Sequence, residues 1–517
     1  MTVQHMDLTD NEYERFRDLL AERSGLYYPE ARRNDLAHGL GKALKTSGYS
    51  TLDEYYNALM SMRRGAEMDR LVSTLTVGES YFFRQIKHFE ALKRLIFPQL
   101  IAERARSSRR IRIWSAGCAA GDEAYSLAIA LRQSLPNIDT WNITILATDI
   151  DQDSIKRAKA ATYSEWSFRE MDPAVRDLYF RFDGKRWALS EEIKRMVDFD
   201  YLNLVEDSYP SLTTNTNAMD VIFCRNVTIY FSQATTAKVL KKFYNALVDK
   251  GWLFVGASEP NLVNYREFSA VNYEGTIIYK KDVTAEVRPS PFAAAPPLVS
   301  PFAQASPTAD LDGRRAPAPP PPPEVPATSA PPAVAPVPAP AAEAPASMLP
   351  TEFPGYDEAL AKLQDGDTEG ALTSLYAQID MTPDHGASFA LLAKTYANQG
   401  QLEQAQHWCE RAIQEDKFLA EAHYTLALIY EEQGMRDKAT ESLRKTLFLD
   451  REHVLAHYVL GTLYRQGGNN EMAKKAWDNA TRILNRRPPN EVVPDSDGVT
   501  TSRLLHVIEA QMTEGVR

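Results

Sequence analysis

The sequence predicts a multidomain protein: an all-α N-terminal domain, a doubly wound α/β domain with a small β-hairpin subdomain, and a C-terminal α-helical superhelix. Three observations support this fold class. Strand-type and helix-type segments alternate between residues 96 and 282, which is typical of a mostly parallel sheet covered on both faces. Residues 283–350 are rich in proline and alanine, a composition that cannot build a core. Beyond them, glycine and alanine recur at a fixed interval, which indicates structural repeats.

These changes in pattern divide the 517 residues into five segments, and a chain of this length favours three or four folded domains. The predicted segments are a helical domain at 1–95, an α/β domain at 96–282, a disordered linker at 283–350, helical repeats at 351–485 and a tail with one helix at 486–517.

The N-terminal segment has two capping boxes, which open amphipathic helices. They are Thr9-x-x-Glu12 and Thr51-x-x-Glu54. The first helix carries its apolar side chains on one face, at Tyr13, Phe16, Leu19 and Leu20. A modestly basic stretch between the two is either a solvated helix face or a docking face for an acidic partner; it contains Arg32, Arg33, Lys42 and Lys45.

The α/β segment is predicted to contain strands at 111–115, 141–149, 219–226, 251–256 and 276–279, with helices at 122–135, 153–161 and 232–247. Right-handed crossovers between the strands are expected. Residues 160–200 interrupt this order with many aromatic side chains around the turn Asp183-Gly184. We expect a small hairpin subdomain there.

A glycine turn between residues 115 and 123 joins the first strand to the first helix, an arrangement that can hold a nucleotide-type ligand. Gly117 and Gly121 flank the turn. Asp149 ends the next strand and is either a ribose-binding acid or a helix cap, while Arg225 and Asn226 end a later strand at the same edge. The spacing fits neither the dinucleotide fingerprint nor the P-loop, so a plain strand–turn–helix remains the alternative.

Several function classes lack their residues. There is no Gly-x-Gly-x-x-Gly, Walker lysine, nucleophile elbow or His/Cys cluster, which argues against hydride transfer, phosphoryl transfer and a metal site. The net charge of −11 argues against a general nucleic-acid binder. Three widely spaced cysteines indicate reduced thiols. Without a signal peptide or an apolar span, we expect a cytoplasmic protein that does not insert into membranes.

The repeats have a period of 34 residues. Glycine recurs at 366, 400, 434 and 468, and alanine at 371, 405, 439 and 473. This pattern resembles the tetratricopeptide repeat, whose units stack into a superhelix with a concave groove. We expect the groove to bind a protein or peptide partner; pure scaffolding is the alternative.

Five ordered motifs between residues 8 and 281 closely resemble the CheR family of chemotaxis receptor methyltransferases. They are Gly-Glu-Ser-Tyr-Phe-Phe-Arg (78–84), Ile-Trp-Ser-Ala-Gly-Cys-Ala-Ala-Gly-Asp-Glu-Ala-Tyr-Ser (113–126), Ala-Thr-Asp-Ile-Asp (147–151), Tyr-Leu-Asn-Leu (201–204) and Ile-Phe-Cys-Arg-Asn-Val-Thr-Ile-Tyr-Phe (222–231). The resemblance implies a methyl transfer from S-adenosylmethionine to glutamate side chains of a methyl-accepting chemoreceptor, in a chemotaxis-like adaptation pathway.

The resemblance also implies site residues. Arg84 and Tyr230 are expected at the methyl-transfer site, Asp149 at the ribose, and Asn203 and Leu204 near the adenine. The full set of expected cofactor contacts is Gly78, Ser80, Arg84, Gly117, Glu123, Asp149, Asn203, Leu204, Arg225 and Asn226. Gly78 stands where the family usually has asparagine, and Ser80 where it usually has threonine.

Two further expectations concern the motif at 78–84. Phe82 and Phe83 are expected in the core, and Arg84 is expected to pair with Glu123, because an arginine buried beside aromatic rings needs a carboxylate. Two other functions stay open: a catalytically weak adaptor or scaffold that senses S-adenosylmethionine, and a small-molecule or nucleic-acid methyltransferase.

Overall fold

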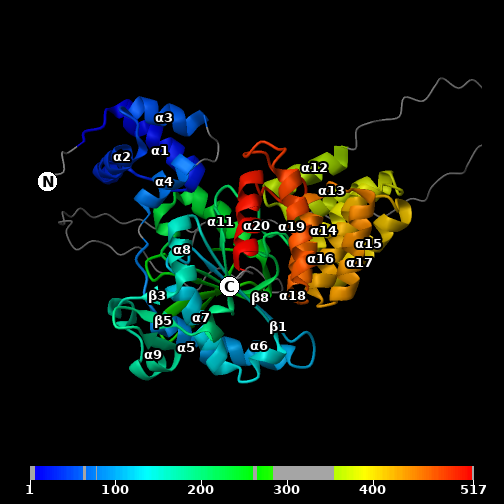
Figure 1. The fold of residues 1–517 in the computed structure, drawn as a ribbon, viewed down its shortest axis with the longest axis horizontal. Helices are drawn as coiled ribbons and strands as arrows, with labels where there is room; N and C mark the ends of the chain where they lie inside the picture. The colour runs from blue at the N-terminus through cyan, green and yellow to red at the C-terminus, as the bar shows by residue number, and fades with distance from the viewer. Residues whose placement is uncertain (1–5, 62–65, 77, 260–264, 283–353, 515–517) are drawn as a thin grey trace, which may run out of the picture. The chain divides into compact units, whose positions relative to one another are not determined.

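A seven-stranded sheet lies at the centre of residues 96–282 in the computed structural model (Figure 1). Its strand order is β6-β2-β1-β7-β8-β10-β9, and every neighbouring pair is parallel except the two pairs made by β10. The strands are β1 (Arg110–Ala116), β2 (Asn142–Asp149), β6 (Val197–Tyr201), β7 (Met219–Cys224), β8 (Leu247–Val255), β9 (Ser269–Tyr273) and β10 (Thr276–Lys280). The prediction of a mostly parallel, doubly wound domain is confirmed.

Helices cover both faces of this sheet because side chains alternate along each strand. Ile111 and Ile113 of β1 belong to the core on one face, and Trp114 and Ala116 to the core on the other. The helices and short turns of this region are α5 (Ile86–Ala91), η2 (Leu92–Ile96), α6 (Phe97–Arg104), α7 (Asp122–Ser134), η3 (Ile138–Thr140), α8 (Gln152–Ala160), η5 (Thr228–Tyr230) and α11 (Gln233–Ala246).

The aromatic insertion forms a separate three-stranded sheet, as the turn at Asp183-Gly184 predicts. Its strand order is β3-β5-β4, all antiparallel. Asp183 closes the hairpin by donating its backbone N–H to the carbonyl of Arg186 at 3.0 Å. Its elements are β3 (Thr162–Tyr163), η4 (Glu165–Phe168), α9 (Pro173–Tyr179), β4 (Phe180–Phe182), β5 (Trp187–Leu189) and α10 (Glu191–Lys194).

The N-terminal helices form their own core (blue in Figure 1). Both halves of the capping box at Thr9 and Glu12 are present, and the apolar face predicted for the first helix is buried. The elements are α1 (Asp10–Ser24), η1 (Glu30–Arg32), α2 (Arg33–Ser47), α3 (Leu52–Ser61) and α4 (Ala66–Leu75). This core confirms an all-α N-terminal domain.

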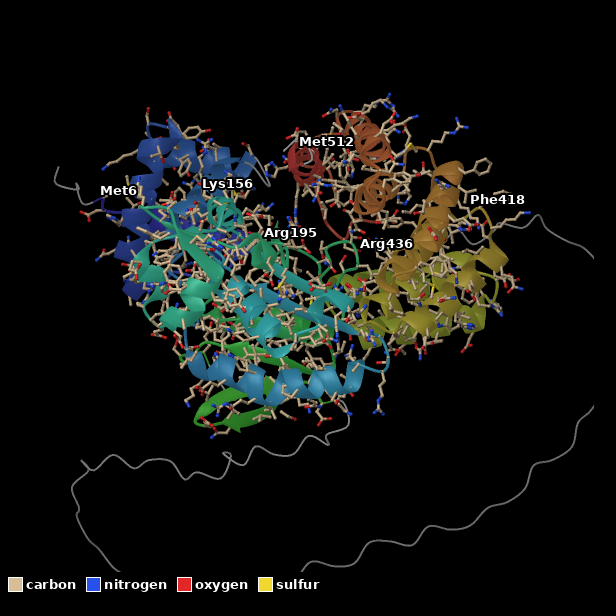
Figure 2. The ribbon with its side chains drawn as sticks, turned by 60° about the horizontal axis from the view of Figure 1, so that its bottom comes forward. Met6, Lys156, Arg195, Phe418, Arg436 and Met512 are labelled. Carbon is tan, nitrogen blue, oxygen red and sulfur yellow. The ribbon has the colours of Figure 1, made fainter. Side chains whose placement is uncertain are left out.

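The repeats form four stacked helix pairs (yellow to orange in Figure 1), followed by α20 (Thr501–Glu514). Each pair turns on the periodic glycine, and all four glycines have φ between 74° and 77°, a conformation that disfavours other residues. The alanines of the period are at most 1% exposed. At the turn before the third pair, Phe418 points away from the core (Figure 2). The pairs are α12 (Pro354–Gln364) with α13 (Thr368–Met381), α14 (Gly386–Asn398) with α15 (Leu402–Glu415), α16 (Ala420–Glu432) with α17 (Arg436–Leu449), and α18 (Val454–Gln466) with α19 (Asn470–Leu484).

The structure describes residues 6–61, 66–76, 78–259, 265–282 and 354–514, so the predicted linker at 283–350 lies outside the described residues. Within the described ranges, no helix combines the length and apolar character needed to span a membrane. The described residues before and after the linker belong to one compact unit, and contacts between the repeats and the α/β domain lie inside it.

Candidate active site

A pocket opens at the carboxyl ends of β1 and β7, where open α/β sheets bind ligands. Seven of the residues expected from the sequence line it: Ser80, Arg84, Gly117, Glu123, Arg225, Asn226 and Tyr230. Six lining residues were not expected: Glu79, Tyr81, Phe89, Ala119, Arg169 and Ile229.

The glycine turn forms one wall of the pocket. Gly117 has φ +83°, and a Cβ added there would lie 2.3 Å from Cγ2 of Val227. Gly121 has φ +86° and is the N-cap of α7, so Asp122 and Glu123 occupy the first turn of that helix. The turn therefore needs glycine at 117 both for its backbone conformation and for close packing against the loop after β7.

Asp149 supports the turn from the end of β2. Its carboxylate accepts the backbone N–H of Ala119 at 2.8 Å and that of Asp151 at 2.8 Å. Burial raises the pKa of Asp149 to about 6, while these backbone hydrogen bonds act in the opposite direction. Asp151 rather than Asp149 caps α8, because its side chain accepts the N–H of Asp153.

The ion pair at the centre of the pocket joins Glu123 to Arg225, with 3.5 Å between Oε2 and Nε. The expected Arg84–Glu123 pair is therefore wrong in its partner. Arg84 is only half-buried, so it does not need a buried carboxylate; its carbonyl oxygen instead accepts Nη2 of Arg225 at 2.6 Å. Glu123 also accepts the Ser115 hydroxyl at 2.7 Å. Burial raises the pKa of Glu123, and the charge of Arg225 opposes that effect.

Glu259 is a positioning residue that the sequence analysis missed. Its buried carboxylate accepts the backbone N–H groups of Asn226, Val227 and Thr228 at 2.7, 3.0 and 2.9 Å. These bonds hold Asn226 at φ +60° and fix the loop that carries Tyr230. The signal was available, because Glu259 follows β8 at the carboxyl ends of the strands, where Asp149 ends β2.

The motif at 78–84 forms the opposite wall. Phe82 and Phe83 are 0% and 6% exposed, which confirms that they belong to the core. On the same wall, the guanidinium of Arg169 lies 3.4 Å from the ring centre of Tyr81 and 3.3 Å from that of Trp166. The pocket thus contains three arginines, and only Arg225 among them is fully buried.

The helical domain is fastened beside the pocket by the loop that carries Tyr230. The Tyr230 carbonyl accepts the N–H of Tyr27 at 2.8 Å, and the side-chain amide of Asn203 donates to the Arg23 carbonyl at 2.6 Å. Asn203 therefore joins the two domains, and its side-chain oxygen accepts the N–H of Val205 at 3.0 Å.

Four expected residues do not line this pocket. Asp149 and Asn203 act through the contacts given above, and Leu204 lies in the hydrophobic core beneath the sheet. A Cβ added at Gly78 would lie 3.3 Å from Ser154 Oγ and 3.5 Å from Arg157 Nη2. The departure from the usual asparagine at 78 therefore faces α8 rather than the pocket.

Two family models cover the first half of the chain. The model described as "CheR methyltransferase, SAM binding domain" matches residues 78–276. The model described as "CheR methyltransferase, all-alpha domain" matches residues 11–76.

Curated relatives agree. A probable chemotaxis protein methyltransferase from Rhizobium etli is 34% identical over 46% of this chain and 87% of its own length. Chemotaxis protein methyltransferase 1 of Pseudomonas aeruginosa is 32% identical over 53% of this chain and 99% of its own length. The chain belongs to the CheR methyltransferase family. It is an S-adenosylmethionine-dependent methyltransferase, as the sequence motifs predict.

The CheR relatives do not account for the second half of the chain. Tetratricopeptide models match residues 362–429 and 420–453. A MamA structure from Desulfovibrio magneticus is 21% identical over 26% of this chain and 76% of that chain, with a TM-score of 0.24. Because that score is low, we base the repeat assignment on the family models and on the glycine and alanine period.

The pocket fits the methyl donor of the CheR family. Arg225 Nη1 and Asn226 Oδ1 are buried in it without a hydrogen-bond partner among the described residues. Buried polar groups normally have a partner, so a donor and an acceptor left open beside Glu123 indicate a polar ligand.

Proposed function

We propose that this enzyme methylates glutamate side chains of a methyl-accepting chemoreceptor, forming γ-glutamyl methyl esters in a chemotaxis-like adaptation pathway. The observation that carries the proposal is the pocket itself. It joins open buried polar groups at Arg225 and Asn226 to a second, more exposed pair of cations, Arg84 and Arg169. One set suits the methyl donor, and the other suits an acidic side chain that enters from solvent.

In this proposal Glu123, Arg225 and Asn226, with Ser80 and Gly117, would hold the amino acid end of S-adenosylmethionine, and Asp149 would hold the ribose. Asn203 and Leu204 would hold the adenine. Because the Asn203 side chain is committed to Arg23 and Val205, any contact from Asn203 to the adenine would come from its backbone. Bound S-adenosylmethionine supplies a methyl group activated by its sulfonium.

The chain's own residues then have to place the glutamate rather than deprotonate it. A glutamate carboxylate is ionised at neutral pH, with an ordinary pKa of about 4.3, so its attack needs no general base. Arg84 attracts and orients the carboxylate, and Tyr230 positions it from the loop fixed by Glu259. Phe89 and Ile229 add apolar surface to the same pocket, beside which electrostatic contacts are stronger than in water.

The test is transfer of labelled methyl from S-adenosylmethionine to receptor fragments, followed by treatment with base. A glutamyl methyl ester releases the label as methanol. Asp149→Ala and Arg225→Met should strongly reduce incorporation when S-adenosylmethionine is not saturating. Label that is stable to base would contradict ester formation, and full activity of Asp149→Ala would contradict the site assignment.

The alternative is an adaptor that senses S-adenosylmethionine without turnover. Glycine in place of the usual asparagine at 78 would favour the adaptor if it removed a hydrogen bond to the cofactor, but Gly78 faces Ser154 and Arg157, which weakens that support. Tight cofactor binding by calorimetry with no methylation of any receptor would favour the adaptor. In either case, we propose that the repeats recruit a protein partner or regulate the enzyme.

A further inference from the structure

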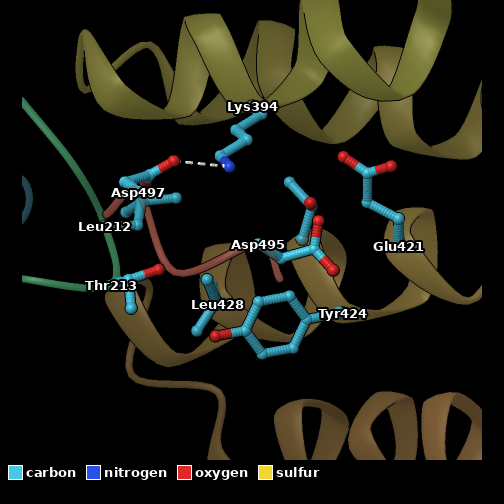
Figure 3. Close-up of a pocket in the computed structure, with 9 residues that line it drawn as sticks. Leu212, Thr213, Lys394, Glu421, Tyr424, Leu428, Asp495 and Asp497 are labelled. Carbon is cyan, nitrogen blue, oxygen red and sulfur yellow. Dashed lines mark ion pairs between the residues drawn. The ribbon is translucent and has the colours of Figure 1, made fainter. Parts of the chain in front are cut away.

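A second pocket lies on the repeats (Figure 3), and none of its lining residues belongs to the cofactor pocket. The helices α14 and α16 supply Lys394, Glu421, Tyr424, Thr425 and Leu428. The remaining lining comes from two segments outside the helix pairs: Leu212 and Thr213 of the methyltransferase domain, and Asp495 and Asp497 from the turn before α20. The groove of the repeats is thus lined in part by the enzyme's own loop.

That loop is bound by specific contacts. The backbone N–H of Leu212 donates to Oδ1 of Asn398 at 2.9 Å, and the Leu212 side chain packs against the hydrophobic clusters of the repeats. The Ser211 hydroxyl donates to Asp497 at 2.6 Å. Asp497 in turn pairs with Lys394 at 2.6 Å, the contact drawn as a dashed line in Figure 3. A leucine between two hydroxyl residues therefore occupies the groove as a peptide ligand would.

A neighbouring set of contacts joins buried charges. Glu432 of α16 pairs with Arg110 at 2.5 Å and with Arg112 at 3.1 Å. The side chains of Arg112 and Glu432 are 3% and 13% exposed. Because a buried arginine without a counter-charge is costly, an arginine in the core strand β1 depends on a glutamate supplied by the repeats.

Asn398 and Glu432 hold the same position in successive repeats. Each is the last residue of the first helix of its pair, α14 or α16. Gln466 ends α18 at the next equivalent position and is exposed. The same position of the repeat therefore contacts the catalytic domain in two consecutive units. This regular spacing indicates a docking surface rather than a chance contact.

The docking surface formed by Asn398 and Glu432 lies at the amino ends of the central strands, and the cofactor pocket lies at their carboxyl ends. Arg110 begins β1, and the loop that carries Leu212 leads into β7 at Met219. The pocket of Arg225 and Asn226 lies beyond the other ends of these strands. The residues of the methyltransferase domain that contact Asn398 and Glu432 do not line the cofactor pocket.

We propose that the groove formed by α14 and α16 is the binding site of the chain's own loop Ser211–Thr213, and that this loop and the Glu432 ion pairs hold the repeats on the methyltransferase domain. A partner peptide that uses this part of the groove has to displace the loop. The other surfaces of the repeats stay available to partners while the loop is bound. This inference does not depend on the substrate proposed above.

Amide hydrogen exchange of the full chain tests the docking. In the unsubstituted protein, the amide of Leu212 and its neighbours to residue 216 should exchange slowly. Asn398→Ala and Glu432→Ala change only the repeats, and each should speed exchange across 211–216 by roughly tenfold or more, because the bonds that close the loop are lost. Gln466→Ala is the matched control at the equivalent position and should leave this exchange unchanged.

A third variant approaches the same contact from the other side. Leu212→Asp places a charge in the groove and should also raise exchange in α14 and α16 at the lining residues. Slow exchange within β7 in every variant shows that the methyltransferase domain is still folded. If residues 211–216 exchange fast in the unsubstituted protein, or as slowly in Asn398→Ala and Glu432→Ala as in Gln466→Ala, the docking proposal is overturned.

Discussion

Arg112 and Arg225 are both buried on the central sheet and both pair with a glutamate, but they are bonded differently. All three guanidinium nitrogens of Arg112 donate hydrogen bonds: Nε to the Asn217 carbonyl at 3.0 Å, Nη1 to Glu432 at 3.1 Å and Nη2 to the Asn215 carbonyl at 2.9 Å. Arg225 has a bond from Nη2 alone, and Nε and Nη1 are buried without a hydrogen-bond partner among the described residues.

The difference separates a structural arginine from one that awaits a ligand. Burial lowers the pKa of both side chains, and the nearby glutamate opposes that effect in each case. At the amino ends of the strands, all three guanidinium nitrogens of Arg112 have hydrogen-bond partners in the protein. At the carboxyl ends, only one nitrogen of Arg225 has such a partner, so a polar ligand can add more hydrogen-bond energy there.

The largest effect on stability is expected for Arg112→Met in the full chain. It leaves Glu432 with Arg110 as its remaining ion-pair partner and frees the buried carbonyls of Asn215 and Asn217, so the free energy of unfolding should fall by about 3–5 kcal/mol. Arg225→Met removes two unsatisfied donors together with the Glu123 ion pair and the bond to the Arg84 carbonyl. Glu123 keeps the Ser115 hydroxyl, so this variant should cost less, about 1–2 kcal/mol. Urea denaturation of both variants measures the two losses of unfolding free energy. Equal losses would contradict the distinction between Arg112 and Arg225.

For cofactor binding, Arg225→Met should have a larger effect than Arg112→Met. Arg225→Met should weaken S-adenosylmethionine binding by about 100-fold, equivalent to about 2.7 kcal/mol, because the open donor is lost. Isothermal titration calorimetry measures this change. An Arg225→Met protein that binds as tightly as the unsubstituted protein would mean that Arg225 is structural as well.

Glu259→Gln tests whether the Glu259 carboxylate fixes the loop from Asn226 to Tyr230 at the carboxyl ends of the strands. Glutamine keeps one oxygen acceptor but loses the charge that holds three successive N–H groups, so the loop from Asn226 to Tyr230 should become more mobile. Methyl transfer should fall by about tenfold, or about 1.4 kcal/mol, while bound cofactor is affected less. Steady-state kinetics of receptor methylation should show the loss mainly in kcat.

The smallest effect concerns pH. Burial raises the pKa of Asp149 to about 6, and a ribose contact needs the ionised form. Affinity for S-adenosylmethionine should therefore fall as the pH is lowered through 6, by about tenfold per pH unit below that value. In Asp149→Asn the affinity should be weaker and flat over the same range. A pH dependence that survives in Asp149→Asn would assign it to another group.

Much of the fold could be predicted from the sequence because its signals are local. The glycine period gave the repeats, and runs of apolar residues gave the buried strands. Two strands were missed, β6 and β9. Both carry alternating polar residues and occupy the two edges of the sheet, so they lack the continuous apolar pattern of buried parallel strands.

The sequence predicted which residues belong to the site better than it predicted which charged side chains form an ion pair. Motifs identified Arg84, Glu123 and Arg225 as neighbours, but local sequence does not say which charges meet. Arg225 pairs with Glu123 because it lies at the end of the adjacent strand, whereas Arg84 stays near solvent. The dependence of Arg112 on Glu432, more than 300 residues away, has no local signal at all.

Calorimetric titration of S-adenosylmethionine into the full chain, Arg225→Met and Glu432→Ala gives the most direct test. It shows whether cofactor binding at Arg225 is independent of the ion pairs that Glu432 makes at the other ends of the strands. The account predicts about 100-fold weaker binding for Arg225→Met and a change of less than about threefold for Glu432→Ala. Unchanged binding in Arg225→Met, or an equal loss in Glu432→Ala, would contradict it.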